Sequence, residues 1–584
     1  METEKEIRIE GIGVSQGIAR ARIFVRTQAF REPAKKTIAE SEVDGERARL
    51  EKGLQVTRHQ IREMYDTVLH DVGAENAAIF EAHLLVLEDS TVLTQVNDSI
   101  SKDLVCADFA FWEVMKRYID ALRAIDDSYL GERVVDIEDV SRRVLRNLRG
   151  ERSTSKGPRE QHILAARDLT PSDTATLDKK KVLGFVTEVG SPTSHTAIMA
   201  RSLQIPAVVG IRGLLRKIRS GDSVLIDGYS GIVFVNPTEE TLEEYSRIEE
   251  QKGAIEQRIL DAREADAQTT DGRGIILSAN IEFPHEAEDV LRFSARGVGL
   301  FRTEFAYMNG DQPGEDVLAE GYEQVVACLE PDLVIFRTVD LGGDKLEPGR
   351  STDLEPNPFL GWRGIRYCLQ RPNLFEAQLR ALLRASARGK VGIMFPLISS
   401  VGEVIEAKQI VEKCKEQLAK RGQAFDPNVQ IGAMIEVPSA AVGADLIAGE
   451  VDFFSIGTND LVQYSLAVDR INESVAHLYQ PSHPAVLRLI NHTVKSAHDA
   501  GIWCGICGEM AGDLNLTPLL LGLGLDEFSV VPSQVPRVKF ALRKLDASEC
   551  QARVKEWFQL ADPALIYQES HRMAMAAYPE LVSS

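Results

Sequence analysis

The chain has 584 residues, of which 44% are hydrophobic and 27% are charged, and its formal net charge at pH 7 is −21. This length predicts about three or four domains, each able to bury a core of its own. The acidic charge argues against binding to nucleic acid or to an anionic membrane, because both of these partners are negatively charged themselves.

Three features of the sequence indicate a cytoplasmic protein. No apolar run reaches the roughly 18 residues that a membrane-spanning helix requires. The first residues, METEKEIRIE, are acidic and lack the hydrophobic region of a signal peptide. The seven cysteines are an odd number spread over a long chain, which favours reduced thiols over a disulfide framework.

The first part of the chain predicts a small α/β domain. Short β-rich runs punctuated by glycine occupy 7–25 and, after a long gap, recur between 162 and 237. Runs of this kind are typical of strands that share one sheet. We therefore expect one domain that is made of two separate stretches of the chain, 1–34 and 151–237.

A helical segment interrupts that domain. No proline occurs between Pro33 and Pro158, and apolar residues such as Leu50 and Leu54 recur at helical spacing. The sequence therefore predicts an inserted bundle of about four helices over 35–150. One face of this bundle is expected to be free to bind a partner.

The second half of the chain predicts a (β/α)8 barrel. A charged, helix-prone stretch at 238–268 is expected to be a linker helix, and the barrel is expected over 269–584. Eight β-type runs alternate there with spacers that are mostly long enough for a helix. The runs are GIILSANI, GVGLFRTE, LVIFRTVD, KVGIMFPL, VQIGAMIEV, VDFFSIGT, GIWCGICGE and LDEFSVVP.

A single histidine stands at a predicted helix start in GSPTSHTAIMARS, residues 190–202. A helix N-terminus offers unpaired backbone N–H groups and a partial positive charge, which favour an anion and disfavour a protonated imidazole. His195 is therefore expected to be neutral and nucleophilic. A phosphoryl group on its ring would meet hydrogen-bond donors. A polar residue in an N-cap region is the plainer alternative.

The ends of the predicted barrel strands carry the other candidate site residues. In a barrel of this kind the active site forms where the strands end. The side chains that the sequence places there are Arg302, Arg337, Glu436, Asn459, Asp460 and Cys507, with Arg470 following closely.

This combination suits a small, highly charged phosphate and carboxylate ligand. A guanidinium group pairs with both kinds of anion. Glu436 and Asp460 would repel such a ligand unless a hard cation lay between them, and Mg²⁺ is typically held by one or two carboxylates together with substrate oxygens. Arginine–carboxylate pairing around a barrel rim could explain any one of these residues, but not all of them in strand register.

The run WCGIC is similar to the redox motif of thioredoxin. Its second cysteine, Cys507, falls at a predicted strand end and not at the start of a helix. A redox function for Cys504 and Cys507 is therefore the weaker interpretation.

Several motifs together resemble the Enzyme I family of the bacterial phosphoenolpyruvate-dependent sugar phosphotransferase system. TSHTAIMARS resembles the family's phosphohistidine signature. Four further runs of this chain resemble the barrel motifs of the family, namely GVGLFRTEF, NPFLGWRGIR, DFFSIGTNDLVQY and CGEMAGD. The motifs occur in the family's order, and the likeness extends from residue 7 to beyond 535.

The resemblance implies an activity and a role for each matching residue. His195 would accept the phosphoryl group of phosphoenolpyruvate, with Thr174 close to its ring, and Cys507 would protonate the enolate to give pyruvate. Glu436 and Asp460 would ligate Mg²⁺. The residues implied to hold phosphoenolpyruvate are Arg302, Arg337, Asn459, Asp460 and Arg470.

The resemblance also implies partners. The helical insert would bind the phosphocarrier protein HPr, with the stretch AIFEAHLLVLED around His83 as a contact surface. The barrel would form a homodimer, as it does in the family. His195 would then pass its phosphoryl group to a histidine of HPr, which is the first step of sugar uptake by this system.

One departure from the family's pattern and two alternatives remain. Family members commonly carry Gly-Gly-Arg before Thr-Ser-His, whereas Ser191 and Pro192 precede Thr193 in this chain, which affects the expected rate and partner preference. The same chemistry could serve a regulatory phosphorelay that is not coupled to transport. A dikinase-type phosphoenolpyruvate enzyme would need a further nucleotide-binding domain, and no P-loop is present.

Overall fold

The computed structural model of the protein describes residues 6–26, 32–71, 74–123, 128–150, 158, 160–175, 177–178, 180–191, 194–203, 205–307, 313–342, 357–470, 472 and 474–582. Among the helices in these ranges, none has the length and apolar character needed to cross a membrane. The chain forms two compact units, Met1–Gln251 and Lys252–Ser584.

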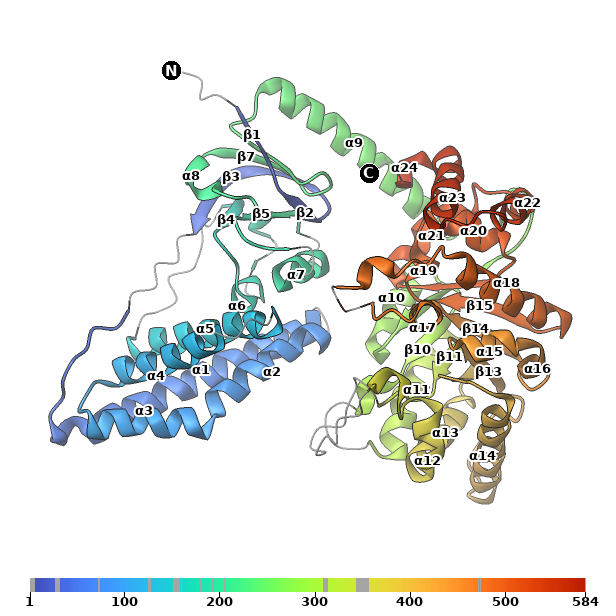
Figure 1. Cartoon of the computed structure of the whole chain (residues 1–584), viewed down its shortest axis with the longest axis horizontal. Coiled ribbons are helices and arrows are strands. Elements are labelled where there is room, and N and C mark those ends of the chain that lie inside the picture. The colour runs from blue at the N-terminus through green and yellow to red at the C-terminus, as the bar shows by residue number, and fades with distance from the viewer. Residues whose placement is uncertain are drawn as a thin grey trace. The chain divides into compact units, whose positions relative to one another are not determined.

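The first unit contains a mixed sheet with the strand order β1-β8-β7-β3-β4-β5-β6-β2 (Figure 1). The four strands from β3 to β6 run parallel, and the other pairs are antiparallel. The strands are β1 (Ile7–Glu10), β2 (Ile12–Ser15), β3 (Ile18–Arg26), β4 (His162–Ala166), β5 (Val182–Thr187), β6 (Ala207–Val209), β7 (Ser223–Asp227) and β8 (Ile232–Val235). The helices that accompany the sheet are α6 (Pro171–Ala175), α7 (His195–Leu203) and α8 (Leu214–Lys217).

The predicted helical insert lies between β3 and β4. Its elements in the described residues are η1 (Glu40–Glu42), α1 (Val43–Asp71), α2 (Ala74–Glu88), α3 (Ser90–Lys102), α4 (Ala107–Arg123) and α5 (Ser128–Leu148). The insert and the sheet share one apolar core, in which Leu54, Ile61 and Phe111 from the helices belong to the same cluster as Leu164 and Phe185 from the strands.

Within the stretch that is expected to contact HPr, His83 itself is buried. Its side chain is only 1% exposed, and its Nε2 lies 3.6 Å from Oδ1 of Asp136 on α5. The ring also packs edge-on against Phe80. In the same stretch it is Leu85 that is exposed, by 70%. Helix α2 is apolar on more than one side, so its sequence does not show which side faces the bundle.

Helix α9 (Glu239–Asp261) runs across the boundary between the two units. Its first turn carries Glu239 and Glu240, which interact favourably with the positive end of the helix dipole. A helix at this place agrees with the charged, helix-prone pattern of the sequence.

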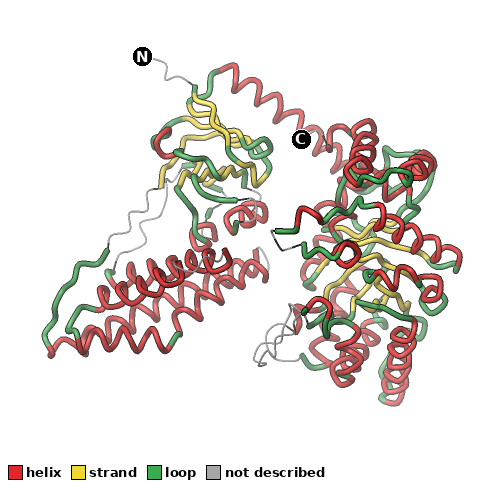
Figure 2. The backbone as a smooth tube through the Cα atoms, in the orientation of Figure 1, coloured by secondary structure: helices red, strands yellow, loops and turns green. Residues whose placement is uncertain are grey.

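The second unit is a closed barrel of eight parallel strands, as predicted, surrounded by helices (Figure 2). The strands are β9 (Ile276–Ile281), β10 (Val298–Arg302), β11 (Val334–Arg337), β12 (Val391–Phe395), β13 (Gln430–Ile435), β14 (Phe453–Gly457), β15 (Trp503–Cys507) and β16 (Glu527–Val530). Each lies within one of the eight runs read from the sequence.

Helices connect the strands and cover the outside of the barrel. The α-helices are α10 (Ala287–Arg292), α11 (Glu315–Leu329), α12 (Ile365–Gln370), α13 (Pro372–Ala385), α14 (Val401–Lys420), α15 (Pro438–Val442), α16 (Ala444–Ala448), α17 (Thr458–Leu466), α18 (Pro484–Asp499), α19 (Glu509–Gly512), α20 (Thr517–Gly522), α21 (Val535–Leu542), α22 (Ala547–Trp557), α23 (Pro563–Ala577) and α24 (Pro579–Val582). Short 3₁₀ turns are η2 (Pro284–Glu286), η3 (Glu304–Tyr307), η4 (Pro358–Leu360), η5 (Ala476–Leu478) and η6 (Pro532–Gln534).

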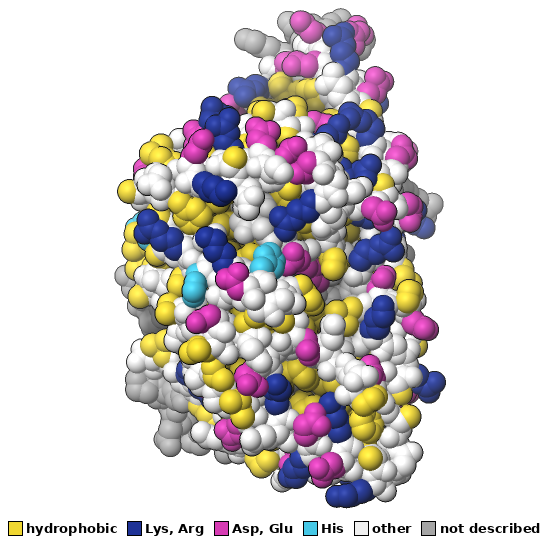
Figure 3. Space-filling view, turned by 90° about the vertical axis from the view of Figure 1, so that its right-hand side faces the viewer, with side chains coloured by type: hydrophobic (Ala, Val, Ile, Leu, Met, Phe, Trp, Pro, Cys, Tyr) yellow, Lys and Arg dark blue, Asp and Glu magenta, His cyan; other side chains and the backbone are white. Residues whose placement is uncertain are grey.

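Two apolar clusters hold the barrel together. One fills the space between strands and helices, and the other includes Leu300, Met394, Met434 and Phe453. On the face shown in Figure 3, Lys and Arg alternate with Asp and Glu, so the acidic excess forms no single patch there.

Candidate active site

The predicted site residues lie where the barrel strands end. Arg302, Arg337 and Cys507 are the last residues of β10, β11 and β15, and Glu436 directly follows β13. Asn459 and Asp460 stand in the first turn of α17, which begins where β14 ends, and Arg470 follows that helix. Because the strands are parallel, these ends meet on one side of the barrel.

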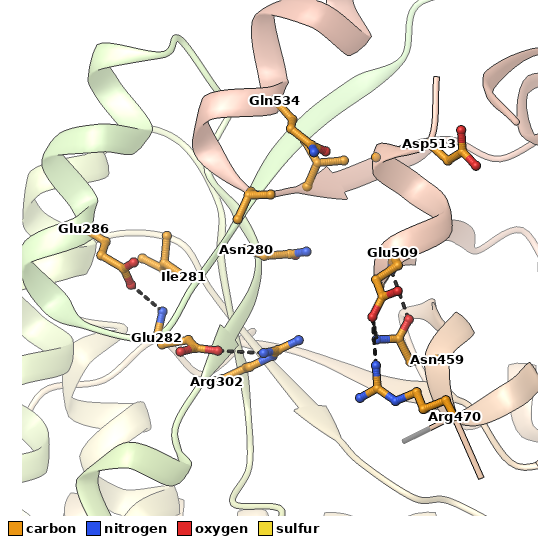
Figure 4. Close-up of a pocket in the computed structure, with 14 residues that line it drawn as sticks. Asn280, Ile281, Glu282, Glu286, Arg302, Asn459, Arg470, Glu509, Asp513 and Gln534 are labelled. Atoms are coloured by element: carbon orange, nitrogen blue, oxygen red, sulfur yellow. Dashed lines mark hydrogen bonds and ion pairs between the residues drawn. The ribbon is translucent and has the colours of Figure 1, made fainter. Parts of the chain in front are cut away.

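Three of these residues line one cavity of about 610 Å³ (Figure 4). They are Arg302, Asn459 and Arg470, and the cavity wall also includes Glu282 and Glu509. Arg337, Glu436 and Cys507 are buried at the strand ends and do not line this cavity.

Two glycines allow the site residues to approach one another. Gly508 has a φ of +89°, and a Cβ there would lie 2.4 Å from Oγ1 of Thr458 and 2.9 Å from Oδ1 of Asn459. A Cβ on Gly457 would lie 2.7 Å from Oε2 of Glu436. Only glycine fits at these positions without displacing the neighbouring side chains.

Carboxylates already accompany two of the arginines. Nη1 of Arg302 donates to Oε1 of Glu282 at 2.6 Å, and burial raises the pKa of Glu282 although this arginine opposes the rise. Arg337 is buried, and its Nη2 donates to Glu304 while its Nη1 lies 3.6 Å from Asp340. Its buried Nε donates no hydrogen bond within the described part of the chain.

Glu509 connects the two remaining cavity donors. Its Oε1 accepts from Nη1 of Arg470 at 2.8 Å and from Nδ2 of Asn459 at 3.3 Å. Its backbone N–H donates to Oδ1 of Asn459 at 3.0 Å. In Figure 4 these three residues lie on one side of the cavity, and Arg302 and Glu282 lie on the other.

Glu436 and Asp460 form the carboxylate pair that the sequence predicts. Glu436 is 2% exposed and accepts from the backbone N–H of Leu397 at 2.6 Å. Burial and then the charge of Asp460 raise the pKa of Glu436 to about 8. A divalent cation would relieve this repulsion, so the pair fits the two carboxylate ligands that Mg²⁺ takes beside substrate oxygens. No cluster of three or more His, Cys, Asp or Glu side chains suited to a metal is present among the described residues.

The thiol of Cys507 faces the inside of the barrel. Its Sγ is 3.6 Å from the Oγ of Ser455, which donates to it, and 3.5 Å from the carbonyl oxygen of Ile456. Burial raises the pKa of this thiol to about 11. Cys504, three residues earlier, belongs to the cluster between strands and helices. The two sulfurs therefore point to opposite sides of β15, which rules out the redox pair.

His195 is the first residue of α7, so the helix start expected from the sequence is confirmed. The Oγ of Ser194 accepts from the backbone N–H of Ala197 at 3.3 Å and caps the helix. Oγ1 of Thr196 donates to the carbonyl oxygen of Leu169 at 2.8 Å, which joins α7 to the segment that leads to Thr174. The side chain of His195, together with Pro192 and Thr193, lies outside the described residues.

Sequence profiles of known families match three parts of the chain. The profile of the PEP-binding domain of PEP-utilising enzymes matches residues 256–547. The N-terminal domain and the mobile domain of PEP-utilising enzymes match at 10–133 and 158–231.

Phosphoenolpyruvate-protein phosphotransferases match the chain along most of its length. That of Staphylococcus carnosus is 42% identical over 544 residues, and that of Bacillus subtilis is 44% identical over 548 residues. Each comparison covers 93% of this chain and 95% of the relative. The chain belongs to the phosphoenolpyruvate-protein phosphotransferase family.

Two further comparisons are with another relative and with a solved structure. The Haemophilus influenzae member of the family is 42% identical over 559 residues, which are 95% of this chain and 96% of that protein. An NMR solution structure of Enzyme I is 42% identical with a TM-score of 0.37, and the match covers 42% of this chain and 98% of that one.

The sequence did not single out several charged residues that lie beside the predicted site residues. Arg363 donates to both carboxylate oxygens of Asp340, at 2.8 and 3.2 Å, and its Nη2 lies 3.6 Å from Asp460. It belongs to the run NPFLGWRGIR, which is noted above only for its resemblance. Glu282 and Glu509 were also missed, although Glu509 is part of CGEMAGD. Their positions directly after strand ends were the available signal.

Proposed function

We propose that this protein transfers the phosphoryl group of phosphoenolpyruvate to His195 and then to a histidine of HPr, and that it releases pyruvate. The observation that supports the proposal is that three arginines and two carboxylates lie on the side of the barrel where the parallel strands end. The membership of the chain in the phosphoenolpyruvate-protein phosphotransferase family gives the substrate its name.

The arginines and the asparagine would hold the substrate. Arg302, Arg337 and Arg470 neutralise the charge on phosphate and carboxylate oxygens, and Asn459 adds a neutral donor. Arg363 acts on Asp340 and Asp460 and is a positioning residue. Glu436 and Asp460 would hold Mg²⁺, which neutralises phosphate charge when bound.

In the proposed reaction the P–O bond of phosphoenolpyruvate breaks and a P–N bond forms on the imidazole of His195. The bond electrons stay on the departing enolate. The thiol of Cys507 then gives its proton to the methylene carbon, which yields pyruvate and a thiolate that regains a proton from solvent. His195 and the barrel belong to different units, so the proposed transfer would carry the phosphoryl group from the second unit to the first.

Three further proposals complete this function. The helical insert would bind HPr, with the exposed Leu85 as part of the contact. A homodimer would form through the barrel, where Val442 and Leu446 expose apolar side chains on the successive helices α15 and α16. Location in the cytoplasm agrees with the seven cysteines, all of which are free.

Radioactive labelling tests the proposed function. Phosphoenolpyruvate carrying ³²P on its phosphoryl group, with Mg²⁺, is expected to label the protein once, in an acid-labile bond. His195→Ala should abolish labelling, whereas His59→Ala, which removes an exposed histidine of α1, should not. Undiminished labelling of the His195 variant would exclude the assignment.

The carrier distinguishes the transport function from its alternatives. Labelled protein is expected to lose its ³²P to HPr. Retention of the label with HPr, but loss to a different carrier, would favour the regulatory phosphorelay. Formation of labelled ATP from added AMP and pyrophosphate would favour a dikinase-type enzyme, which is the weaker alternative because the chain matches the phosphotransferases over 95% of their length.

A further inference from the structure

The geometry around Glu509 resembles that of a bound ligand oxygen. Two donors on different parts of the chain, Nη1 of Arg470 and Nδ2 of Asn459, both donate to the same atom, Oε1 of Glu509. Both donors line the cavity, and both belong to the proposed substrate-binding set. A carboxylate or phosphate oxygen of a ligand would need the same two donors.

The fold does not need this carboxylate for its stability. The side chain of Glu509 is 73% exposed, and ion pairs at such exposure contribute little to the free energy of unfolding. What anchors the residue is its backbone N–H, which donates to Oδ1 of Asn459. The carboxylate could therefore leave Arg470 while the backbone of α19 stays in place.

Glu282 on the opposite wall is different. Among the described residues, its side chain accepts a hydrogen bond from Arg302 only, and it is 27% exposed. Its backbone N–H is held by Oε2 of Glu286 at 2.7 Å. Glu282 therefore does not bridge two cavity donors. Of these two carboxylates, only that of Glu509 resembles a bound ligand.

We propose that the carboxylate of Glu509 occupies the place of a substrate oxygen between Arg470 and Asn459, and that an anionic ligand must displace it. The inference rests on the proposed function, because it takes phosphoenolpyruvate and pyruvate as the ligands. Glu509 then lowers, by a common factor, the affinity of every anion that uses these two donors.

The expected effect is modest because the ion pair is exposed. Replacing Glu509 by glutamine keeps the shape of the side chain but removes the charge that competes with the ligand. An exposed pair of this kind corresponds to about a two- to five-fold change in affinity. The dissociation constants of phosphoenolpyruvate and pyruvate should both decrease by this common factor. The KM for phosphoenolpyruvate should decrease as well, and kcat should not increase.

Calorimetry with the full chain tests the proposal. Binding of phosphoenolpyruvate and of pyruvate, each with Mg²⁺, is measured in a His195→Ala background, which accepts no phosphoryl group, with and without Glu509→Gln. Asp513→Asn is the matched control, because it removes one negative charge from the same cavity wall. The Asp513 carboxylate is directed away from Arg470 (Figure 4).

Each outcome decides the question. Tighter binding of both ligands by Glu509→Gln, but not by Asp513→Asn, supports displacement. Weaker binding would show that Glu509 positions Arg470 and Asn459 for the ligand, and unchanged binding would show no competition, so both overturn the proposal. An equal gain from Asp513→Asn overturns it too, because the effect would then be one of net charge. If the parent protein with Glu509 intact binds no phosphoenolpyruvate, the proposed function itself fails.

Discussion

Replacing Cys507 by alanine should separate phosphoryl transfer from formation of pyruvate. The pKa of this thiol is raised to about 11 by burial, so only about one molecule in 10⁴ carries a thiolate at pH 7. The group therefore holds its proton until a strong base, such as an enolate, arrives. A positioned acid contributes roughly 10²- to 10⁴-fold to a rate, and we expect pyruvate formation to slow by about 10²-fold or more.

The same strand supplies the matched control. Cys504→Ala deletes an identical sulfur from β15, but from the side that faces the helices. Each deletion leaves a small buried cavity, so the two variants should lose a similar free energy of unfolding, about 1 kcal/mol. Urea denaturation measures this loss. Both variants should lose this stability, but only the Cys507 variant should also form pyruvate more slowly.

The assay follows pyruvate with lactate dehydrogenase and follows labelled His195 separately. The reverse reaction, from phosphorylated His195 to added pyruvate, should slow equally in the Cys507 variant, because the same group must then take up the proton. Passage of the label to HPr should be unaffected. Equal damage from both cysteine variants, or loss of the HPr step in the Cys507 variant alone, would refute the reasoning.

Three further predictions concern the barrel. Burial raises the pKa of Glu527 to about 7 from 4.5, so its charge should destabilise the folded state as the pH rises through this interval. Glu527→Gln should therefore raise the urea midpoint at pH 8 and not at pH 4. Parallel pH profiles of stability for the two proteins would contradict this. Gly508→Ala places a Cβ against Asn459 at a positive φ and should lower the free energy of unfolding by about 1–3 kcal/mol. It should also weaken the binding of phosphoenolpyruvate, measured by calorimetry. An unchanged dissociation constant for phosphoenolpyruvate would refute the close packing. Because the pKa of Glu436 is raised, this carboxyl must lose a proton before a cation binds. The affinity for Mg²⁺ should therefore increase between pH 6 and pH 8, and Glu436→Gln should remove this dependence. A wild-type affinity for Mg²⁺ that does not change with pH would refute the metal assignment.

The barrel and most of its site could be predicted because they obey short-range rules. Each strand is a compact apolar run, and a residue that ends such a run must lie at the mouth. The two cysteines of WCGIC illustrate this, since an odd separation along a strand sends them to opposite sides. Arg302 and Arg337 could be placed by the same reasoning.

The rest depended on contacts between distant segments. Arg363 lies in a connection without periodicity, more than twenty residues after β11, and only the fold brings it to Asp340. Glu509 could be placed at the mouth, but its bond to Arg470 arises from the path of the chain after α17. Which residues of α2 are buried could not be predicted because α2 is apolar on more than one side, and the burial of His83 is decided by its contact with α5.

The helical insert is the crossover connection between the parallel strands β3 and β4. Two adjacent parallel strands need a crossover connection, normally of a dozen or more residues, and here residues 27–161 supply it, with Arg22 beside His162 and Arg26 beside Ala166. The bundle is thus an enlarged crossover, not an appendage. A deletion that leaves a short linker would preserve the strand order, but it would expose Leu164 and Phe185, which the insert helps to bury. Exchanging the bundle between relatives, as a test of its proposed role in binding the carrier, therefore requires transplanting its sheet-facing side together with its outer one.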